Sequence, residues 1–400
     1  MGTDGTGHTF PGPCLPFGMV QPGPDNRDQG WDYTSGYQYQ DTTIIGFSKT
    51  RANGTGISEF GDILLQPVTV SRTDKFGEGY NKQSERAAPG YYSVTLRNQV
   101  KVELSASERV AFHKYTYPNY KAKLLVDLQH GLRFLTDSLV LESDVRSNNQ
   151  NSISGFCHTK NWVDRKYFFF IQFDQPFVVS TELGKKLKEK APRYILEFEL
   201  KDRLLKTKVA MSTVSVDGAI ANLKAEIPEW DFEGTVAQAK QKWNEYLSRI
   251  EIDADQKQKE IFYSCMYRLF IQPSNIADVD GKYRGADDVV RQAENKEYYS
   301  TLSLWDTYHD CGQMSAWYIF STLGFYPVNP GNGTFVFGVP QAKKIIVRLA
   351  KSKELVISLT SDKQNVSVFE VQLNGKKILD HSVAYSTLIK GGKLEFISEN

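Results

Sequence analysis

Short runs of alternating hydrophobic and polar residues dominate the chain up to about residue 228. Clear examples are the runs at 91–117, 122–130 and 166–173, which Gly, Pro, Asn and Asp residues separate from their neighbours. A period of two residues places every second side chain on the same face of a strand, so these runs predict β-strands with a buried face. Many strands at such turn-separated spacing predict a β-sandwich.

The hydrophobic period becomes helical at Asp231. Apolar residues recur on one helical face over 231–252, and we predict a second helix that ends at Pro273. A third helix is predicted over 312–323, where Gly324 can terminate it. The pattern therefore changes from strands to helices near residue 230.

Strand-like runs return after residue 324, and the last of them contains Asn374 and Gly375, the residue pair typical of a two-residue hairpin turn. We therefore predict three parts: a β-sandwich domain over 1–230, a helical part over 231–324 and a β segment over 325–400. The predicted fold class is β + α.

The composition removes several classes of partner. The chain has 400 residues, and its 48 Lys and Arg against 47 Asp and Glu give a net charge of +1, so we expect neither nucleic acid nor an anionic membrane as a partner. We expect no membrane span, because no stretch approaches the roughly 18 consecutive apolar residues that one needs. The first residues, MGTDGTGHTFPGP, lack the basic and apolar parts of a signal peptide.

Aromatic residues are the unusual component, with 23 Phe, 21 Tyr and 6 Trp. Flat rings stack on the apolar faces of sugars, although they are also ordinary core material. The four cysteines stand far apart and form no CxxC or Cys/His pattern, so the sequence gives no argument for zinc.

The first 62 residues are rich in Gly and Pro and carry His8, Trp31, Asp32, Tyr37 and Tyr39 in loop-like contexts. Aromatic rings beside carboxylates suit a sugar subsite, because a pyranose has an apolar face and a belt of hydroxyls. The alternative is a Gly/Pro-rich edge of a sandwich that aromatic side chains fill. His8 could contact a substrate hydroxyl or simply bond a backbone carbonyl.

In the helical half, Asp306 follows Trp305, and Asp310 stands where a helix begins. The sequence Asp310-Cys-Gly-Gln313 matches a helix capping box, a structural role worth about 1 kcal/mol. A carboxylate at this position could equally orient water as a general base.

Five stretches together resemble glycoside hydrolase family 92, the calcium-dependent exo-acting α-mannosidases typical of bacteria related to Bacteroides. They are GTDGTGHTFPGPCLPFGMVQPGPDN, SGYQYQDTTIIGFSKTRANGTGISEFGDILLQP, DVDGKYRG, YYSTLSLWDTY and DCGQMSAWYIFSTLGFYPVNPGNGTFVFGVP. The resemblance implies an N-terminal β-sandwich packed on an (α/α)6 barrel and inverting hydrolysis of terminal α-mannose in glycans, with α-1,2 linkage expected. It also implies a bound Ca²⁺, whose ligands we do not assign, and a periplasmic or secreted location.

The resemblance also assigns residues. Asp310 is similar to the family's general base, and Trp305 and Asp306 to the Trp-Asp pair that lines the subsite for the terminal mannose. The sandwich side of the site would consist of His8, Trp31, Gly54, Thr55 and Gly56.

The chain departs from the family at one junction. The Leu-Trp-Asp-Thr-Tyr and Asp-x-Gly-Gln-Met motifs, which a long run of barrel helices separates in the family, are fused here as LWDTYHDCGQM. That run carries the general-acid glutamate. Independently, a closed barrel needs on the order of 250 to 300 residues, whereas 231–324 can hold about four helices.

We therefore expect an internally shortened barrel, with Trp243, Trp317 and Phe320 short of partners. Three interpretations follow: an α-mannosidase-type enzyme with impaired chemistry, a non-catalytic carbohydrate-binding or structural remnant, or a coding segment lost from the gene model between Tyr308 and His309. Glu294 or Glu297 could act as a surrogate acid.

Overall fold

The computed structural model describes residues 2–54, 56–68, 77–133, 139–183, 192–300, 310–360 and 369–398. The chain divides into two compact units. Unit 1 comprises 1–243 and 270–311, and unit 2 comprises 244–269 and 312–400. The predicted boundaries at residues 230 and 324 remain a prediction.

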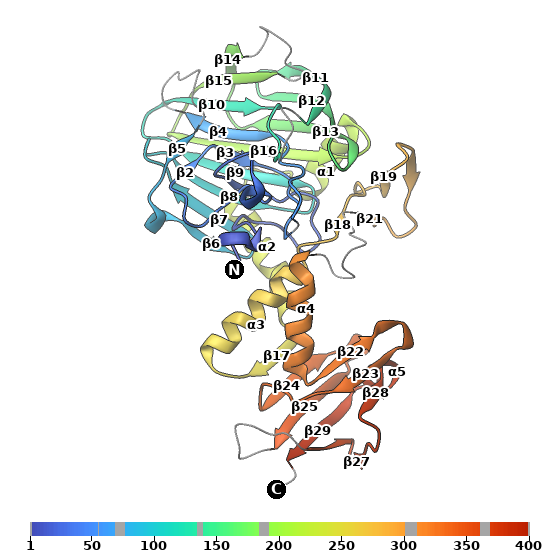
Figure 1. Cartoon of the computed structure of the whole chain (residues 1–400). Helices are drawn as coiled ribbons and strands as arrows, with labels where there is room; N and C mark the ends of the chain where they lie inside the picture. Colours follow the sequence, from blue (N-terminus) through green and yellow to red (C-terminus); the bar gives the residue numbers. More distant parts are fainter. Residues whose placement is uncertain are drawn as a thin grey trace. The chain divides into compact units, whose positions relative to one another are not determined.

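Unit 1 is built on two antiparallel sheets (Figure 1). The six-stranded sheet has the order β1 (Gly23–Asp25), β3 (Gly46–Ser48), β4 (Leu64–Val68), β10 (Lys121–Asp127), β15 (Arg193–Glu199) and β14 (Phe177–Leu183). The eight-stranded sheet has the order β11 (Val140–Asn149), β12 (Ser152–Lys160), β13 (Asp164–Phe173), β16 (Leu204–Ser212), β9 (Val110–Thr116), β8 (Lys101–Ala106), β7 (Tyr91–Thr95) and β6 (Arg86–Ala88).

One hydrophobic core joins the two sheets, which confirms the predicted β-sandwich. Leu124 and Phe198 enter it from the six-stranded sheet, and Phe169 and Val209 enter it from the eight-stranded sheet. Burying apolar side chains at about 25 cal/mol per Å² is the main stabilising contribution in such a layer.

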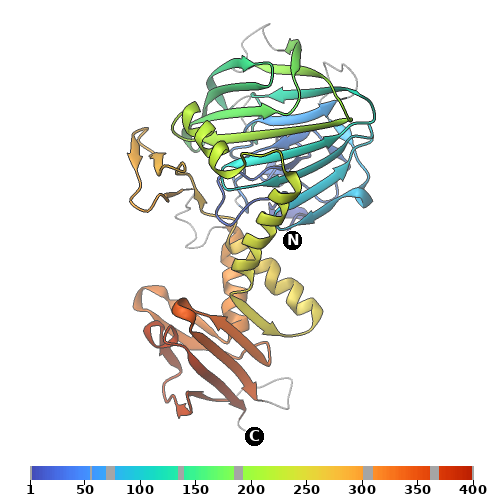
Figure 2. The ribbon, with the colours of Figure 1, turned by 180° about the vertical axis from the view of Figure 1, so that it is seen from behind.

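The eight-stranded sheet is also covered on its outer face, by helix α1 (Val216–Glu226) (Figures 1 and 2). Along β9, Ala111 and Tyr115 lie in the core between the sheets, whereas Val110 and Phe112 pack with Leu223 of α1. Ser215 caps α1, since its side chain accepts a hydrogen bond from the Gly218 N–H at 3.0 Å. Our description of the chain as strand-like up to residue 228 was wrong for this helix.

Helix α2 (Phe232–Leu247) follows, and its first part belongs to unit 1. Trp243 is only 1% exposed, and its indole Nε1 donates to the Cys14 carbonyl at 2.7 Å. The expectation that Trp243 would lack partners was therefore wrong, because the N-terminal Gly/Pro segment covers it.

The remaining elements of unit 1 are short. They include the pairs β2 (Thr43–Ile44) with β5 (Glu78–Gly79), β18 (Ser274–Asn275) with β21 (Tyr299–Ser300), and β19 (Lys282–Arg284) with β20 (Val290–Gln292), and the 3₁₀ turns η1 (Gly5–Gly7), η2 (Trp31–Tyr33) and η3 (Lys82–Ser84). The buried Asp278 anchors the segment that carries these last strands, because its carboxylate accepts from Ser212 Oγ at 2.6 Å and Asn222 Nδ2 at 2.8 Å.

Unit 2 contains helices α3 (Gln256–Leu269) and α4 (Asp310–Leu323), of which Asp310 and Cys311 are assigned to unit 1. A six-stranded sheet has the order β17 (Ile250–Asp253), β24 (Lys344–Arg348), β25 (Glu354–Thr360), β29 (Gly392–Ser398), β26 (Phe369–Leu373) and β27 (Lys376–Lys377). A three-stranded sheet has the order β22 (Phe325–Asn329), β23 (Thr334–Phe337) and β28 (Ser382–Ala384). Short helical turns are α5 (Tyr385–Leu388), η4 (Pro330–Asn332) and η5 (Ala350–Ser352).

Two predictions about unit 2 are confirmed. Asn374 and Gly375 both have positive φ, at 52° and 74°, between the paired residues Leu373 and Lys376, as a two-residue hairpin turn requires. Trp317 on α4 is 48% exposed, as expected. The expectation that Phe320 would lack partners was wrong, because its ring packs edge-on and tilted against aromatic rings of β22 and β23.

The helical part is short. The described residues between 231 and 324 form three α-helices, α2, α3 and α4, with short strands between them. These three helices cannot close an (α/α)6 ring, so the described fold is a β-sandwich with an abbreviated helical part.

Candidate functional site

His8 and Trp31 lie together in the N-terminal loops of unit 1. Their ring centroids are 5.4 Å apart with an interplanar angle of 78°, an edge-to-face arrangement. His8 is buried at 4% exposure and has φ 49°, whereas Trp31 is 49% exposed at the start of η2. The histidine therefore braces an indole that still presents half of its surface to solvent.

Gly54 and Gly56 lie against the same two residues. The Gly54 N–H donates to the His8 carbonyl at 2.7 Å. A Cβ atom on Gly56 would lie 2.4 Å from Trp31 Cη2, so only glycine lets the indole approach this closely. The structure therefore brings together four residues that the sequence assigned to the sandwich side of the site, while Thr55 lies outside the described residues.

A fully buried ion pair, Arg51 with Asp25, links segments of the same N-terminal loops. Arg51 Nη1 lies 2.5 Å from Asp25 Oδ1, and Arg51 also donates to the carbonyls of Ser35 and Gly23 at 2.5 Å. His130 Nε2 lies 2.8 Å from the second oxygen of Asp25. Buried charges persist where they are paired and hydrogen-bonded, as the Asp25 carboxylate is by Arg51 and His130.

The pairing also sets the charge states. Burial works against the charged form of Asp25, yet Arg51 and His130 hold the pKa of its carboxyl below the ordinary value. Burial likewise works against charged His130, and Asp25 outweighs it and raises the pKa of the imidazole. The pairing therefore favours the charged forms of Asp25 and His130. Arg51 ties the segments at Gly23 and Ser35 to its own segment.

This cluster was not predicted from the sequence. Asp25 and Arg51 both stand inside the Gly/Pro-rich stretches that we singled out, and charged residues in such stretches were the available signal. Their pairing across 26 residues, and with His130 a further 105 positions from Asp25, depends on the tertiary fold.

A second buried cluster lies at the other end of the loop that carries Gly56. Asp62 accepts from Thr50 Oγ1 at 2.5 Å and pairs with Arg165. Glu59 is 5% exposed, and one of its carboxylate oxygens accepts from the Trp162 N–H at 3.1 Å. Burial raises the pKa of Glu59, although Arg165 opposes that shift.

The structure describes only some of the predicted barrel-side residues. Trp305 and Asp306 lie outside the described residues. Asp310 is the first residue of α4, and its side chain is not among those described. Glu294 and Glu297 are exposed, and Glu297 accepts from the Tyr299 hydroxyl at 3.0 Å. The roles of all these residues remain predictions.

The structure shows no set of ligands for the predicted calcium in the parts of the chain that it describes. Within those parts, no three His, Cys, Asp or Glu side chains gather in a way that could hold a metal ion. The acidic segment at 278–288 uses its carboxylates otherwise: Asp278 bonds Ser212 and Asn222, and Asp287 pairs with Arg291 at 2.6 Å.

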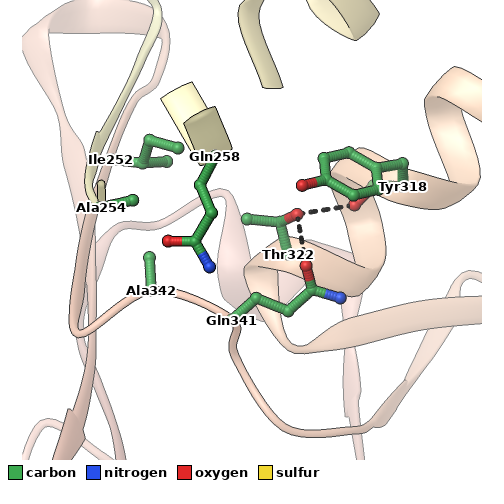
Figure 3. A pocket seen from close by; sticks show the side chains of 7 residues that line it. All are labelled: Ile252, Ala254, Gln258, Tyr318, Thr322, Gln341 and Ala342. Carbon is green, nitrogen blue, oxygen red and sulfur yellow. Dashed lines mark hydrogen bonds between the residues drawn. The ribbon is translucent and has the colours of Figure 1, made fainter. Parts of the chain in front are cut away.

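A small hollow in unit 2 lies between β17, α3, α4 and the loop before β24 (Figure 3). Its walls are Ile252, Ala254, Gln258, Tyr318, Thr322, Gln341 and Ala342. Thr322 Oγ1 donates to the Tyr318 carbonyl at 2.8 Å and lies 3.5 Å from Gln341 Oε1. The side chains fill the hollow, so it does not offer a sugar site.

The fold is a β-sandwich joined to a short helical part and a second β unit, and comparison with known families identifies it. The description "Glycosyl hydrolase family 92 N-terminal domain" matches residues 1–212. "Glycosyl hydrolase family 92 catalytic domain" matches in two segments, 218–309 and 309–399. The chain belongs to glycosyl hydrolase family 92, and it is shorter than full-length members of that family.

Individual relatives agree with this assignment. An "Uncharacterized secreted glycosidase" of Arthroderma benhamiae is 26% identical over 369 residues, which cover 81% of this chain and 46% of the relative. The chain thus spans about half the length of this curated relative.

Solved structures share the fold. A family 92 α-mannosidase from Bacteroides thetaiotaomicron has a TM-score of 0.90 at 20% identity, with 100% of this chain and 93% of that one covered. A second family 92 enzyme of the same species, described as an inverting mannosidase, has a TM-score of 0.84 at 15% identity, with coverages of 100% and 96%. One further structure, with a TM-score of 0.90 at 19% identity and coverages of 100% and 93%, is a complex of the former enzyme with mannoimidazole.

No helix in the described part of the chain has the length and apolar character needed to cross a lipid bilayer.

Proposed function

We propose that this chain is an exo-acting, inverting α-mannosidase-type protein that recognises terminal α-mannose in glycans, with α-1,2 linkage as the expected preference, and that its hydrolytic activity is strongly impaired. The observation that carries the proposal is the assembled loop site of His8, Trp31, Gly54 and Gly56 in a chain of glycosyl hydrolase family 92.

The chemistry of that loop site supports sugar recognition. An indole that is half exposed and held edge-on by His8 presents a fixed apolar surface, and fixing the surface before binding lowers the entropic cost of binding. One bound relative of the same fold carries mannoimidazole, which supports mannose as the sugar. Asp310 is proposed as the general base, with Trp305 and Asp306 in the terminal-mannose subsite.

The junction at residue 309 supports the impairment. The two segments that match the catalytic domain meet at that residue, where the sequence reads LWDTYHDCGQM. An inverting glycosidase needs a general acid as well as a base. Loss of general-acid catalysis alone lowers the rate by on the order of 10² to 10⁴.

Calcium dependence and location complete the proposal. Ca²⁺ is proposed as the cofactor by family resemblance alone, with no ligands assigned among the described residues. Secretion is proposed because the curated fungal relative is described as secreted.

The test is release of mannose from α-1,2-mannobiose, measured with added calcium and again with a chelator, alongside a full-length family member. We expect turnover lower than that of the full-length enzyme by at least about a hundredfold. Turnover equal to that of the full-length enzyme would contradict the proposed impairment. An Asp310→Asn variant should abolish any residual turnover if Asp310 acts as the base.

The second candidate function is binding without cleavage, which the intact sandwich-side loops favour. Calorimetry with methyl α-mannoside or mannobiose at millimolar concentration tests it, with and without calcium. Absence of any heat of binding under all these conditions would exclude a mannoside-binding function and leave a structural one.

A further inference from the structure

A second exposed indole lies near the loop site. The connection between β12 and β13 consists of residues 161–163, and its Trp162 is 74% exposed, followed by Val163 at 43%. A single exposed apolar side chain needs no explanation, because folded proteins carry many. Trp162 differs from such residues because hydrogen bonds from the connection fix its backbone.

Two hydrogen bonds tie the connection to the loop that carries Gly56. The backbone N–H of Trp162 donates to Glu59 Oε2 at 3.1 Å, and Asn161 Nδ2 donates to the Ser58 carbonyl at 2.8 Å. Glu59 is 95% covered, and a carboxylate is costly to bury unless it has partners. A buried acid is therefore used to hold the backbone of an exposed tryptophan.

The same loop holds Trp31 at its other end. Trp31 packs against Gly56, and Glu59, which holds Trp162, is three residues further along. Three residues span at most about 11 Å. Ile57, between the two attachment points in the sequence, is itself 39% exposed.

We propose that Trp31 and Trp162 are two stacking surfaces of one oligosaccharide-binding edge, and that Trp162 contacts a sugar residue further from the terminal mannose than the one at Trp31. This inference rests on the proposed function, since it assumes that a mannoside binds at the His8–Trp31 site. Trp162 then determines the preference for chain length.

The experiment measures the affinity of the intact chain for three probes by calorimetry: methyl α-mannoside, α-1,2-mannobiose and a linear α-1,2-mannotetraose. The variants are Trp162→Ala, Trp162→Phe and Trp317→Ala. Trp317 is a matched control, because it is an exposed tryptophan in unit 2. Because Trp162 is so exposed, its replacement should leave the thermal unfolding temperature unchanged.

For the wild-type chain we expect tighter binding of the tetraose than of the monosaccharide. Trp162→Ala should weaken tetraose binding by about two- to tenfold, the worth of one aromatic stacking contact, without changing the affinity for methyl α-mannoside. Trp162→Phe should recover most of the loss, and Trp317→Ala should bind all three probes like the wild type.

Each other result has a distinct meaning. If methyl α-mannoside binds but Trp162→Ala leaves tetraose affinity unchanged, this inference is wrong and the proposed function stands. If Trp162→Ala weakens all three probes equally, the length-dependent role of Trp162 is wrong. If none of the probes binds the wild type, both the inference and the mannoside-recognition function are overturned.

Discussion

The guanidinium of Arg51 and the carboxylate of Asp25 form a fully buried pair with 2.5 Å between Nη1 and Oδ1, and Arg51 stands three residues before Gly54, whose N–H donates to the His8 carbonyl. Arg51 also donates to two backbone carbonyls, of Ser35 and Gly23. The pair thus couples the stability of the sandwich to the geometry of the candidate sugar site.

Breaking the Arg51–Asp25 pair should strongly lower the free energy of unfolding. Arg51→Met leaves the Asp25 carboxylate buried without its main partner, which costs about 3–5 kcal/mol in the free energy of unfolding. The measurement is urea denaturation followed by circular dichroism. Arg348→Met is the control, because its pair with Glu251 is exposed and should matter little. A similar small loss for both variants would contradict the role of the buried pair.

Gly56→Ala should damage the site more than the fold. The new Cβ would lie 2.4 Å from Trp31 Cη2, so the indole has to move away from its place beside His8. We expect methyl α-mannoside affinity to fall by about tenfold or more with the unfolding transition nearly unchanged. Gly338→Ala is the matched control, because a Cβ there meets no heavy atom within 4 Å. Wild-type affinity in Gly56→Ala would mean that the position of Trp31 does not matter for binding.

Local patterns predicted most of the fold. The helices α2, α3 and α4 and the turn at Asn374 follow from periodicity, glycine and turn chemistry, all of which act within a few residues. Helix α1 escaped the prediction because it is short and follows directly on the strand-like run that ends in β16.

The contacts that could not be predicted from the sequence join residues that lie far apart in the chain. Trp243 looked unpartnered because its acceptor, the Cys14 carbonyl, is 229 residues away. The Asp25, Arg51 and His130 cluster was missed for the same reason. By contrast, the meeting of His8, Trp31, Gly54 and Gly56 followed from family resemblance, which carries tertiary information that periodicity lacks.

Stability should depend on pH through Lys208. This lysine is buried on β16, where Nζ donates to the carbonyls of Ile227 at 2.9 Å and Pro228 at 3.0 Å. Burial lowers the pKa of its ammonium from 10.5 to about 8. Between pH 8 and 10.5 the unfolded chain therefore binds more protons than the folded chain, so the free energy of unfolding gains a contribution that rises with pH.

Lys208→Met removes that titration and should flatten the rise in unfolding free energy between pH 8 and 10.5. The measurement is chemical denaturation at half-unit pH steps for both proteins. An identical pH slope in wild type and variant would show that Lys208 does not titrate in this window.

Asp174 should act in the opposite direction and in a different window. Burial raises the pKa of its carboxyl from 3.8 to about 6, against the opposing hydrogen bond from the Lys206 N–H at 2.9 Å. The folded chain therefore binds the proton more readily, and this group's contribution to the unfolding free energy grows as pH falls from 6 towards 3.8. Denaturation of Asp174→Asn over that range should lack this contribution, and a curve parallel to that of the wild type would refute the assignment.

Trp243 and Trp317 test whether the shortened helical part leaves apolar side chains exposed. Trp243 is 1% exposed and hydrogen-bonded to the Cys14 carbonyl, whereas Trp317 is 48% exposed on α4, next to Met314 at 66% one turn earlier. Trp243→Ala should lower the unfolding free energy by about 3–5 kcal/mol, because it opens a cavity and strands a buried carbonyl. Trp317→Gln should change it by less than about 0.5 kcal/mol and reduce binding of the apolar dye ANS, since it removes exposed apolar surface. Comparable destabilisation by the two substitutions would mean that α4 is covered in solution, and that the shortened helical part has found partners for Trp317 as it has for Trp243.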